Sequence, residues 1–523
     1  APLSANRKLL DKIDYLEKRI LDLEGKGFCP GPSSSSNSSG GSSRERSTPS
    51  PSQPSPSTTS SERRSQHRGA SSRGDVVPGA NMVWNNDPIA IANFQIPPSD
   101  LTPRLRKDLI GGFLRNRDKC YFDLHVGRFI ASLSLPPADP KAPHPALVDA
   151  ILLVACYFSR APYLVGYESG LLAAANTNLS TSFHRNDRLH DFIRASNLIS
   201  FYYFCKGMYP EAYQQIISSC HVTVTCGLHQ IPSPAWTPVG RREDDNRFLS
   251  YPADGVEQGE RIYTFWQVFC LHRMISMAVS LPTHLPGGPN LDPFPQILTA
   301  WPRLLYEYEN GAVFDMDAKS VAQLFLNQTS TLPGRLETLD SLRCQGYALV
   351  YKADHLLSEQ AACIGPSPQE ILITDGAIQT FMSRLPHLRN SGDCGEIPAN
   401  AGLPVINYRI VTIHTLAHVA SLILHQHGAD VSARRRCTRA AQGIAAVIGQ
   451  LTDADYSELF IGLGYLWYMA GQILLTITAN ANGSVAEQYR SWALVVISAL
   501  KKISMVYRPL GKLVLHMYRS SKL

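Results

Sequence analysis

Apolar residues recur at helical spacing along most of the chain, from about residue 98 to the end. This spacing places them on one face of an α-helix, whereas the alternation typical of β-strands is scarce. Segments rich in proline and glycine separate the periodic stretches. The pattern predicts helices over residues 147–159, 192–205, 209–228, 260–280, 342–363, 406–427, 436–451 and 456–479. Since no fixed-length repeat is present, we predict an all-α fold with one large helical domain over residues 98–523.

The opening residues carry a different apolar pattern, with leucines and isoleucines at intervals of 4, 3, 4 and 3 residues. These positions are Leu9, Ile13, Leu16, Ile20 and Leu23. With isoleucine at position a of the heptad and leucine at d, the pattern favours a parallel two-stranded coiled coil. The same register puts Asn6 at a, where a buried amide pair disfavours other registers.

Charged residues beside this seam agree with a parallel homodimer. Lys12 and Arg19 fall at position g, and Glu17 and Glu24 fall at e. Lys12 would then face Glu17 of the second copy, and Arg19 would face Glu24. We predict a dimerisation coiled coil over residues 1–26; the alternative is an amphipathic helix that lies on its own domain. Because so short a coil is marginal in water, other contacts must help to hold the dimer.

Residues 27–97 are dominated by serine and proline and have almost nothing to bury, which predicts a disordered linker. Arginines are scattered among the serines, at Arg44, Arg46, Arg63, Arg64, Arg68 and Arg73. Such a segment could be phosphorylated, attract DNA weakly or direct nuclear import. We favour the simpler interpretation of a solvated linker.

Residues 459–479 are uncharged and long enough to cross a bilayer. However, Gln472, Thr476 and Thr478 interrupt the apolar run, and no cluster of Lys or Arg flanks it. We therefore expect a buried core helix and no membrane partner.

Composition adds few constraints. The 523 residues include 49 basic and 43 acidic side chains, a net charge of +6, which is too even a balance to mark the whole chain as a nucleic-acid binder. The 11 cysteines are scattered singly without any Cys-x-x-Cys pair, which predicts reduced, buried thiols inside a cell. A charged amphipathic segment stands where a secretory signal would be apolar, and Ala1 in place of methionine leads us to expect a fragment.

Catalytic motifs are missing from the sequence. His414 and His418 are four residues apart and His425 follows, but a zincin would need Glu where Thr415 stands, so we expect packing histidines. No Gly-x-Ser-x-Gly, phosphate-binding or dinucleotide-binding motif occurs. We predict that the chain is not an enzyme and has no catalytic, cofactor-binding or metal-binding residues. We expect Glu260 to cap the start of its helix.

Two further groups allow a functional or a structural interpretation. The basic run Arg434, Arg435, Arg436 with Arg439 could direct nuclear import or contact phosphate, although a solvated helical turn is favoured. The second group is aromatic and could line an effector-binding groove, although core packing is favoured: Tyr202, Tyr203, Phe265 and Trp266.

Several helical segments together resemble one protein family. They are HPALVDAILLVA (144–155), FYYFCKGMYPEAY (201–213), CGLHQI (226–231), ERIYTFWQVFCLHR (260–273) followed by SLP (280–282), LAHVASLILH (416–425) and CTRAAQ (437–442). In this order they are similar to the regulatory middle homology domain of the fungal zinc-binuclear-cluster transcription factors. The resemblance covers roughly residues 100–480.

The resemblance implies a nuclear transcription regulator of RNA polymerase II genes that acts as a homodimer. In that family a short parallel coil follows the zinc cluster and sets the spacing of the DNA half-sites. The cluster itself needs six closely spaced cysteines, which this chain lacks, so zinc and DNA contact are implied only for a module upstream of Ala1. The implied partners are a second copy of the chain, DNA through that module, and the transcription machinery or coregulators.

Two alternatives remain open. The chain could be a cluster-less co-regulator that acts through protein partners. The second alternative, which we rank behind the co-regulator, is an all-α ligand-binding protein or enzyme whose site the sequence does not reveal.

Overall fold

The computed structural model describes residues 97–521 except 238–247, 282, 286–295, 315–318, 326–336, 362–367, 389–405 and 429. The described residues form helices joined by loops and contain no β-strand, which confirms the predicted all-α class. The predicted coiled coil (1–26) and all but the last residue of the predicted linker (27–97) lie outside the described residues. All described residues belong to one unit, Asp87–Leu523.

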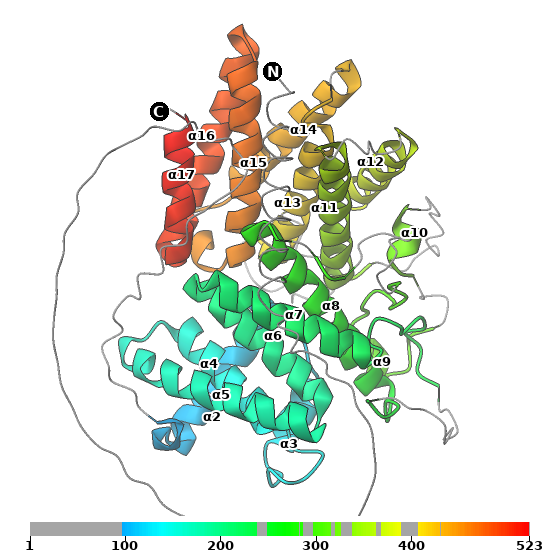
Figure 1. The fold of residues 1–523 in the computed structure, drawn as a ribbon, viewed down its shortest axis with the longest axis vertical. Coiled ribbons are helices and arrows are strands. Elements are labelled where there is room, and N and C mark those ends of the chain that lie inside the picture. The colour runs from blue at the N-terminus through cyan, green and yellow to red at the C-terminus, as the bar shows by residue number, and fades with distance from the viewer. Residues whose placement is uncertain are drawn as a thin grey trace, which may run out of the picture. The chain divides into compact units, whose positions relative to one another are not determined.

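The first group of helices occupies the lower half of Figure 1. Its members are α2 (Pro103–Asn116), α3 (Val126–Ser132), α4 (Pro145–Ser159), α5 (Val165–Arg185), α6 (Leu189–Lys206), α7 (Tyr209–Thr225) and α8 (Gly255–Val279). α4 packs against α2, α5 and α6, and α7 packs between α6 and α8. α4 begins where His144 accepts a hydrogen bond from the Ala146 backbone N–H and Pro145 takes the first helical position.

The second group contains the remaining long helices. It comprises α11 (Leu339–Ala361), α12 (Pro368–Ser383), α13 (Tyr408–His425), α14 (Val431–Ile448), α15 (Ile461–Asn480), α16 (Gly483–Val506) and α17 (Gly511–Ser521). α13 lies at its centre, because it packs against α11, α12, α14 and α15. Two short helices, α9 (Leu305–Glu309) and α10 (Val321–Phe325), lie between the groups in the chain (Figure 1).

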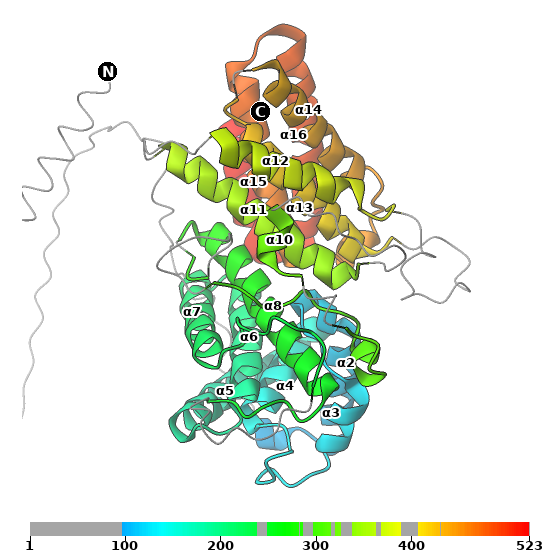
Figure 2. The same ribbon diagram turned by 90° about the vertical axis from the view of Figure 1, so that its right-hand side faces the viewer.

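α8 connects the two groups, since it packs against α6 and α7 in the first and against α11 and α15 in the second (Figure 2). Most of its residues are buried, and the others are half-buried. It begins at Gly255, where the Asp254 side chain accepts a hydrogen bond from the Glu257 backbone N–H at 3.0 Å. The prediction that Glu260 caps this helix is therefore wrong: Glu260 lies in the second turn, and its carboxylate accepts from the His125 backbone N–H at 2.8 Å.

α15 is the one described helix that is long and apolar enough to cross a membrane. Length and composition alone do not distinguish such a span from a core helix. Within the protein, 56% of its apolar window is buried, and the helix packs against α13, α16 and α17. This packing favours the interpretation as a core helix.

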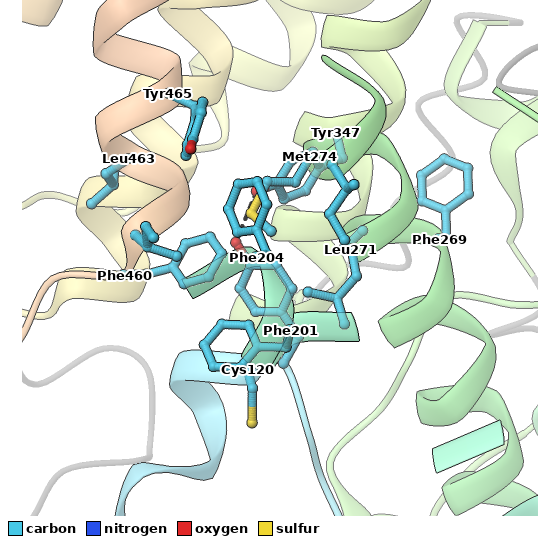
Figure 3. Close-up of a cluster of buried hydrophobic side chains, with 14 of the residues drawn as sticks. Cys120, Phe201, Phe204, Phe269, Leu271, Met274, Tyr347, Phe460, Leu463 and Tyr465 are labelled. Atoms are coloured by element: carbon cyan, nitrogen blue, oxygen red, sulfur yellow. Dashed lines mark hydrogen bonds between the residues drawn. The ribbon is translucent and has the colours of Figure 1, made fainter. Parts of the chain in front are cut away.

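A shared apolar core joins the two groups of helices. Phe201 and Phe204 of α6 meet Phe460 and Tyr465 at the start of α15, with ring centroids 6.3 Å apart for Phe201–Phe460 and 4.8 Å apart for Phe204–Tyr465 (Figure 3). Met274 of α8 lies in the same cluster. Burying such large rings contributes roughly 2–3 kcal/mol each, so the two groups are held together by core packing.

Candidate functional site: a buried polar junction

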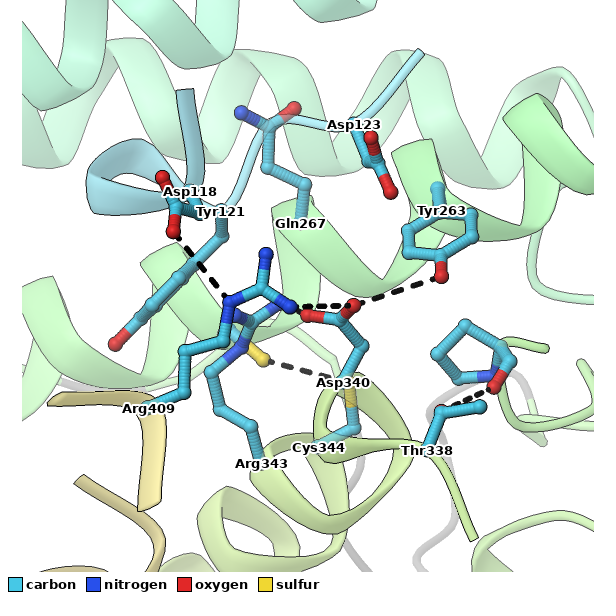
Figure 4. A network of polar contacts seen from close by, with 12 residues as sticks. Asp118, Tyr121, Asp123, Tyr263, Gln267, Thr338, Asp340, Arg343, Cys344 and Arg409 are labelled. Carbon is cyan, nitrogen blue, oxygen red and sulfur yellow. Dashed lines mark hydrogen bonds and ion pairs between the residues drawn. The ribbon is translucent and has the colours of Figure 1, made fainter. Parts of the chain in front are cut away.

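The segment from Arg117 to His125 lies where the two groups of helices meet. It follows α2, and the short 3-10 helix Arg117–Cys120 ends at Tyr121, which adopts a left-handed conformation with φ 56°. This reversal of the chain is stabilised by hydrogen bonds from the backbone N–H of Tyr121 to the Asp118 carbonyl and from that of Phe122 to the Arg117 carbonyl. It brings the side chains of Asp118, Tyr121 and Asp123 to the second group (Figure 4).

Asp340, at the start of α11, is the central carboxylate of the junction. It pairs with Arg343 at 2.7 Å and with Arg409 of α13 at 3.6 Å. Tyr263 of α8 donates to it at 3.5 Å. Burial opposes ionisation of this carboxyl, but Arg343 and Arg409 outweigh that effect and lower its pKa. Asp340 is therefore a carboxylate at neutral pH, held by groups from three helices.

The other carboxylates of the junction are paired as well. Asp118 lies 3.4 Å from the Arg409 Nε and accepts a hydrogen bond from the Tyr408 hydroxyl. Asp123 pairs with Arg117 at 3.3 Å. Burial raises the pKa of Asp123, and the negative charge of Asp340 adds to that rise. Each carboxylate thus has a guanidinium partner.

Aromatic rings and thiols complete the junction. The Arg343 guanidinium lies 4.1 Å from the centre of the Tyr121 ring, and the Tyr121 and Tyr347 hydroxyls are 2.9 Å apart. The Cys270 thiol of α8 donates to the Cys344 sulfur of α11 at 3.8 Å. Burial raises the pKa of Cys344 well above its ordinary value, so this thiol stays protonated.

This arrangement is suited to connecting helices rather than to acid–base or nucleophilic catalysis. A general base needs a carboxylate or imidazole free to take a proton, and a nucleophile needs an activated thiol or hydroxyl. At the junction the carboxylates are paired with arginines and the Cys344 thiol stays protonated. The cost of burying these charges is offset only while every partner stays in place.

Of the three histidines of α13, His414 and His418 are packing residues, whereas the expectation of a packing role is wrong for His425. His414 contacts the Pro386 carbonyl through Nε2 at 2.8 Å, and burial lowers the pKa of both His414 and His418. His425 instead pairs with Asp375 of α12 at 2.9 Å. Among the described residues, no group of three or more His, Cys, Asp and Glu side chains could hold a metal ion.

The aromatic group and the basic run, for which the sequence allowed two interpretations each, have different surroundings. Tyr202, Phe265 and Trp266 are buried core residues, as favoured, whereas Tyr203 is half-buried. In the basic run, Arg434, Arg435 and Arg439 are exposed on α14, and Arg436 is half-buried and pairs with Asp375.

The predicted dimerisation residues lie outside the described residues, so the structure brings none of them together. They are Asn6, Leu9, Lys12, Ile13, Leu16, Glu17, Arg19, Ile20, Leu23 and Glu24. Sequence reasoning missed the polar junction. One available signal was Asp340 and Arg343, two charged residues three positions apart at the start of a helix whose following positions are apolar.

Comparisons with protein-family models, with curated proteins and with solved structures found no match for this chain.

Proposed function

We propose that this chain is the dimerising and regulatory part of a nuclear transcription factor of the fungal zinc-binuclear-cluster type. Its first residues pair two copies in parallel, its helical domain passes a regulatory signal, and a zinc module upstream of Ala1 reads DNA. The observation that carries the proposal is the order of the helical segments that resemble the family's regulatory domain.

The positions of these segments support the proposal. Residues 144–155 coincide with the N-cap and most of α4, residues 201–213 with the α6–α7 hairpin, and residues 260–273 with α8. Residues 416–425 and 437–442 lie on α13 and α14. The resemblance therefore involves packed helices of one helical body.

The polar junction fits a regulatory role in this proposal. It ties α8 and the 117–125 segment of the first group to α11 and α13 of the second through paired charges. Such a network favours one arrangement of the helices over others, because every alternative leaves a buried charge unpaired. In this proposal, a regulatory signal that shifts the helices of one group thus also shifts the helices of the other group.

The test joins the complete chain to an unrelated monomeric DNA-binding domain and measures transcription from a reporter that carries two of its sites. We expect a several-fold change in transcription relative to the DNA-binding domain alone. The Ile13→Glu variant, which places a charge in the predicted seam, should lose cooperative occupancy of the paired sites. Unchanged transcription together with a monomeric fusion protein would contradict the proposal.

A cluster-less co-regulator is the second candidate, supported by the absence of closely spaced cysteines from the 523 residues. The coding sequence immediately upstream of Ala1 distinguishes the two. A Cys-x2-Cys-x6-Cys pattern there supports the zinc-cluster factor, and an in-frame stop supports the co-regulator.

A further inference from the structure

Arg273 of α8 is a fully buried arginine whose hydrogen-bonding capacity is largely unused. Its Nη2 donates to the Leu285 carbonyl, whereas Nε and Nη1 have no hydrogen-bond partner among the described residues. The guanidinium carbon lies 3.6 Å from the centre of the Tyr351 ring and 4.9 Å from that of Phe269. The aromatic contacts and the Tyr351 hydroxyl favour a cation here, but Nε and Nη1 remain without an acceptor among the described residues.

Two other buried arginines have carboxylate partners. Arg343 pairs with Asp340, and Arg261 pairs with Glu257. Within the described part of the chain, no carboxylate pairs with Arg273. Burial lowers the pKa of Arg273 to about 10, so the group keeps its positive charge at neutral pH. A buried charge without a counterion is strongly unfavourable.

His272, the preceding residue, offers another unused donor. The His284 backbone N–H donates to His272 Nε2 at 3.2 Å, which leaves the proton of the neutral ring on Nδ1. Burial lowers the pKa of His272 well below its ordinary value, so the ring is neutral. Nδ1 is buried and has no hydrogen-bond partner among the described residues.

Ser276 lies one turn further along the same helix, four residues from His272 and three from Arg273. Its hydroxyl is also buried and lacks a hydrogen-bond partner in the described part of the chain. His272, Arg273 and Ser276 thus lie within five consecutive residues of α8, and each carries a buried polar atom without a hydrogen-bond partner among the described residues. An oxyanion has the complementary chemistry, because it brings negative charge and several acceptor lone pairs.

We propose that Arg273, His272 and Ser276 form a binding site for a small oxyanion, a carboxylate or a phosphate group. The ligand accepts hydrogen bonds from the Arg273 guanidinium and supplies the counterion that the described residues do not provide. This site goes beyond the proposed function and does not depend on it, since binding is measured on the chain without DNA.

The experiment titrates the complete chain with inorganic phosphate, and separately with succinate, in a chloride buffer of constant ionic strength. Isothermal calorimetry and thermal unfolding are recorded at pH 7. We expect saturable binding of one equivalent and a rise in Tm that follows occupancy. The stronger of the two titrants identifies whether a phosphate or a carboxylate is preferred.

Variants connect the binding to Arg273. Arg273→Met should weaken the affinity at least tenfold, and in chloride alone it should be no less stable than the unmodified chain, because it removes an uncompensated charge. Ser276→Ala, which keeps the helix intact, should weaken binding several-fold. Arg194→Met is the matched control: Arg194 is buried against Phe122 and donates to the Asp123 carbonyl, so its loss should lower stability without changing the affinity.

Three results would overturn the proposal. One is stabilisation by phosphate and succinate that is equal in the unmodified chain and in Arg273→Met. Another is an affinity for phosphate and succinate that is unchanged both in Ser276→Ala and in Arg273→Lys. The third is a large loss of stability in Arg273→Met in chloride alone, since that would mean that the chain itself already compensates the charge of Arg273.

Discussion

A single buried imidazole shows how the surroundings of one residue make stability depend on pH. His418 of α13 is packed against Gly443 of α14, and its Nδ1 has no hydrogen-bond partner among the described residues. Burial, with a smaller effect of His414, lowers the pKa of His418 from 6.5 to about 4. Protonation of this ring is therefore disfavoured in the folded chain.

We predict that His418 makes the folded chain less stable as the pH falls from 6.5 to 4. Across this interval the unfolded state binds more protons than the folded state, so acidification favours unfolding, by roughly 1–3 kcal/mol for this one group. Urea unfolding at several pH values measures the effect. His418→Leu should remove this part of the dependence of the unfolding free energy on pH. His427→Leu, at an exposed position, should leave that dependence unchanged.

Gly443 provides a second prediction at the scale of one residue. A Cβ added at this position would collide with the His418 ring. Gly443→Ala should therefore cost about 1–3 kcal/mol in the free energy of unfolding, despite the higher helix propensity of alanine.

The matched control is Gly111→Ala on α2, where the nearest atom to the added Cβ would be Arg115 Nη1 at 3.6 Å. That variant should gain up to about 1 kcal/mol. If adding His418→Ala to the Gly443→Ala variant did not restore its stability, the collision with the His418 ring would not be the cause of the loss.

At the scale of helices, Asp340 contributes to the stability of the fold through contacts with several helices and not through α11 alone. We expect Asp340→Asn to lower the free energy of unfolding by about 3–5 kcal/mol, because it leaves buried Arg343 without its carboxylate and removes one of the two carboxylates that pair with Arg409. Asp453→Asn is the control, since Asp453 pairs with Lys502 at 2.8 Å but is 86% exposed; its loss should cost less than about 1 kcal/mol. Equal effects in chemical denaturation would contradict this account of the junction.

Several helices with strongly apolar patterns were predicted from the sequence, whereas α2, α5, α12, α16 and α17 were missed, α16 although its apolar residues recur at helical spacing. α4, α6, α7 and α8 were predicted because apolar residues recur along their whole length. α5 was missed, since its asparagines and threonines are weak helix formers. It forms because α4 and α6 pack against it and bury Leu171, Ala175 and Leu179.

Apart from the pair Asp340–Arg343 within α11, the polar junction was beyond prediction for a different reason. Asp118, Asp340 and Arg409 are separated by long stretches of chain, and each is an ordinary charged residue in its local sequence. Only the left-handed turn at Tyr121 and the packing of α8 against α11 bring them together. Local patterns contain no information about such pairings.

For the whole molecule, we propose that the coiled coil predicted over residues 1–26 determines the oligomeric state. We expect the complete chain to be dimeric in analytical ultracentrifugation and Ile13→Glu to shift it toward monomer, because a buried charge at position a opposes pairing. Lys18→Glu is the control, since the same register places Lys18 at the outward-facing position f. A monomeric chain at high concentration, or equal dissociation of both variants, would exclude the coil as the dimer contact.

The core shared by α6 and α15 has a practical consequence for attempts to divide this protein. A fragment that stops before α11 would expose Phe201 and Phe204 to water, and one that begins there would expose Phe460 and Tyr465. Such surfaces promote aggregation. Neither half is expected to remain soluble by itself, so any minimal version of this protein has to retain both groups of helices in one polypeptide.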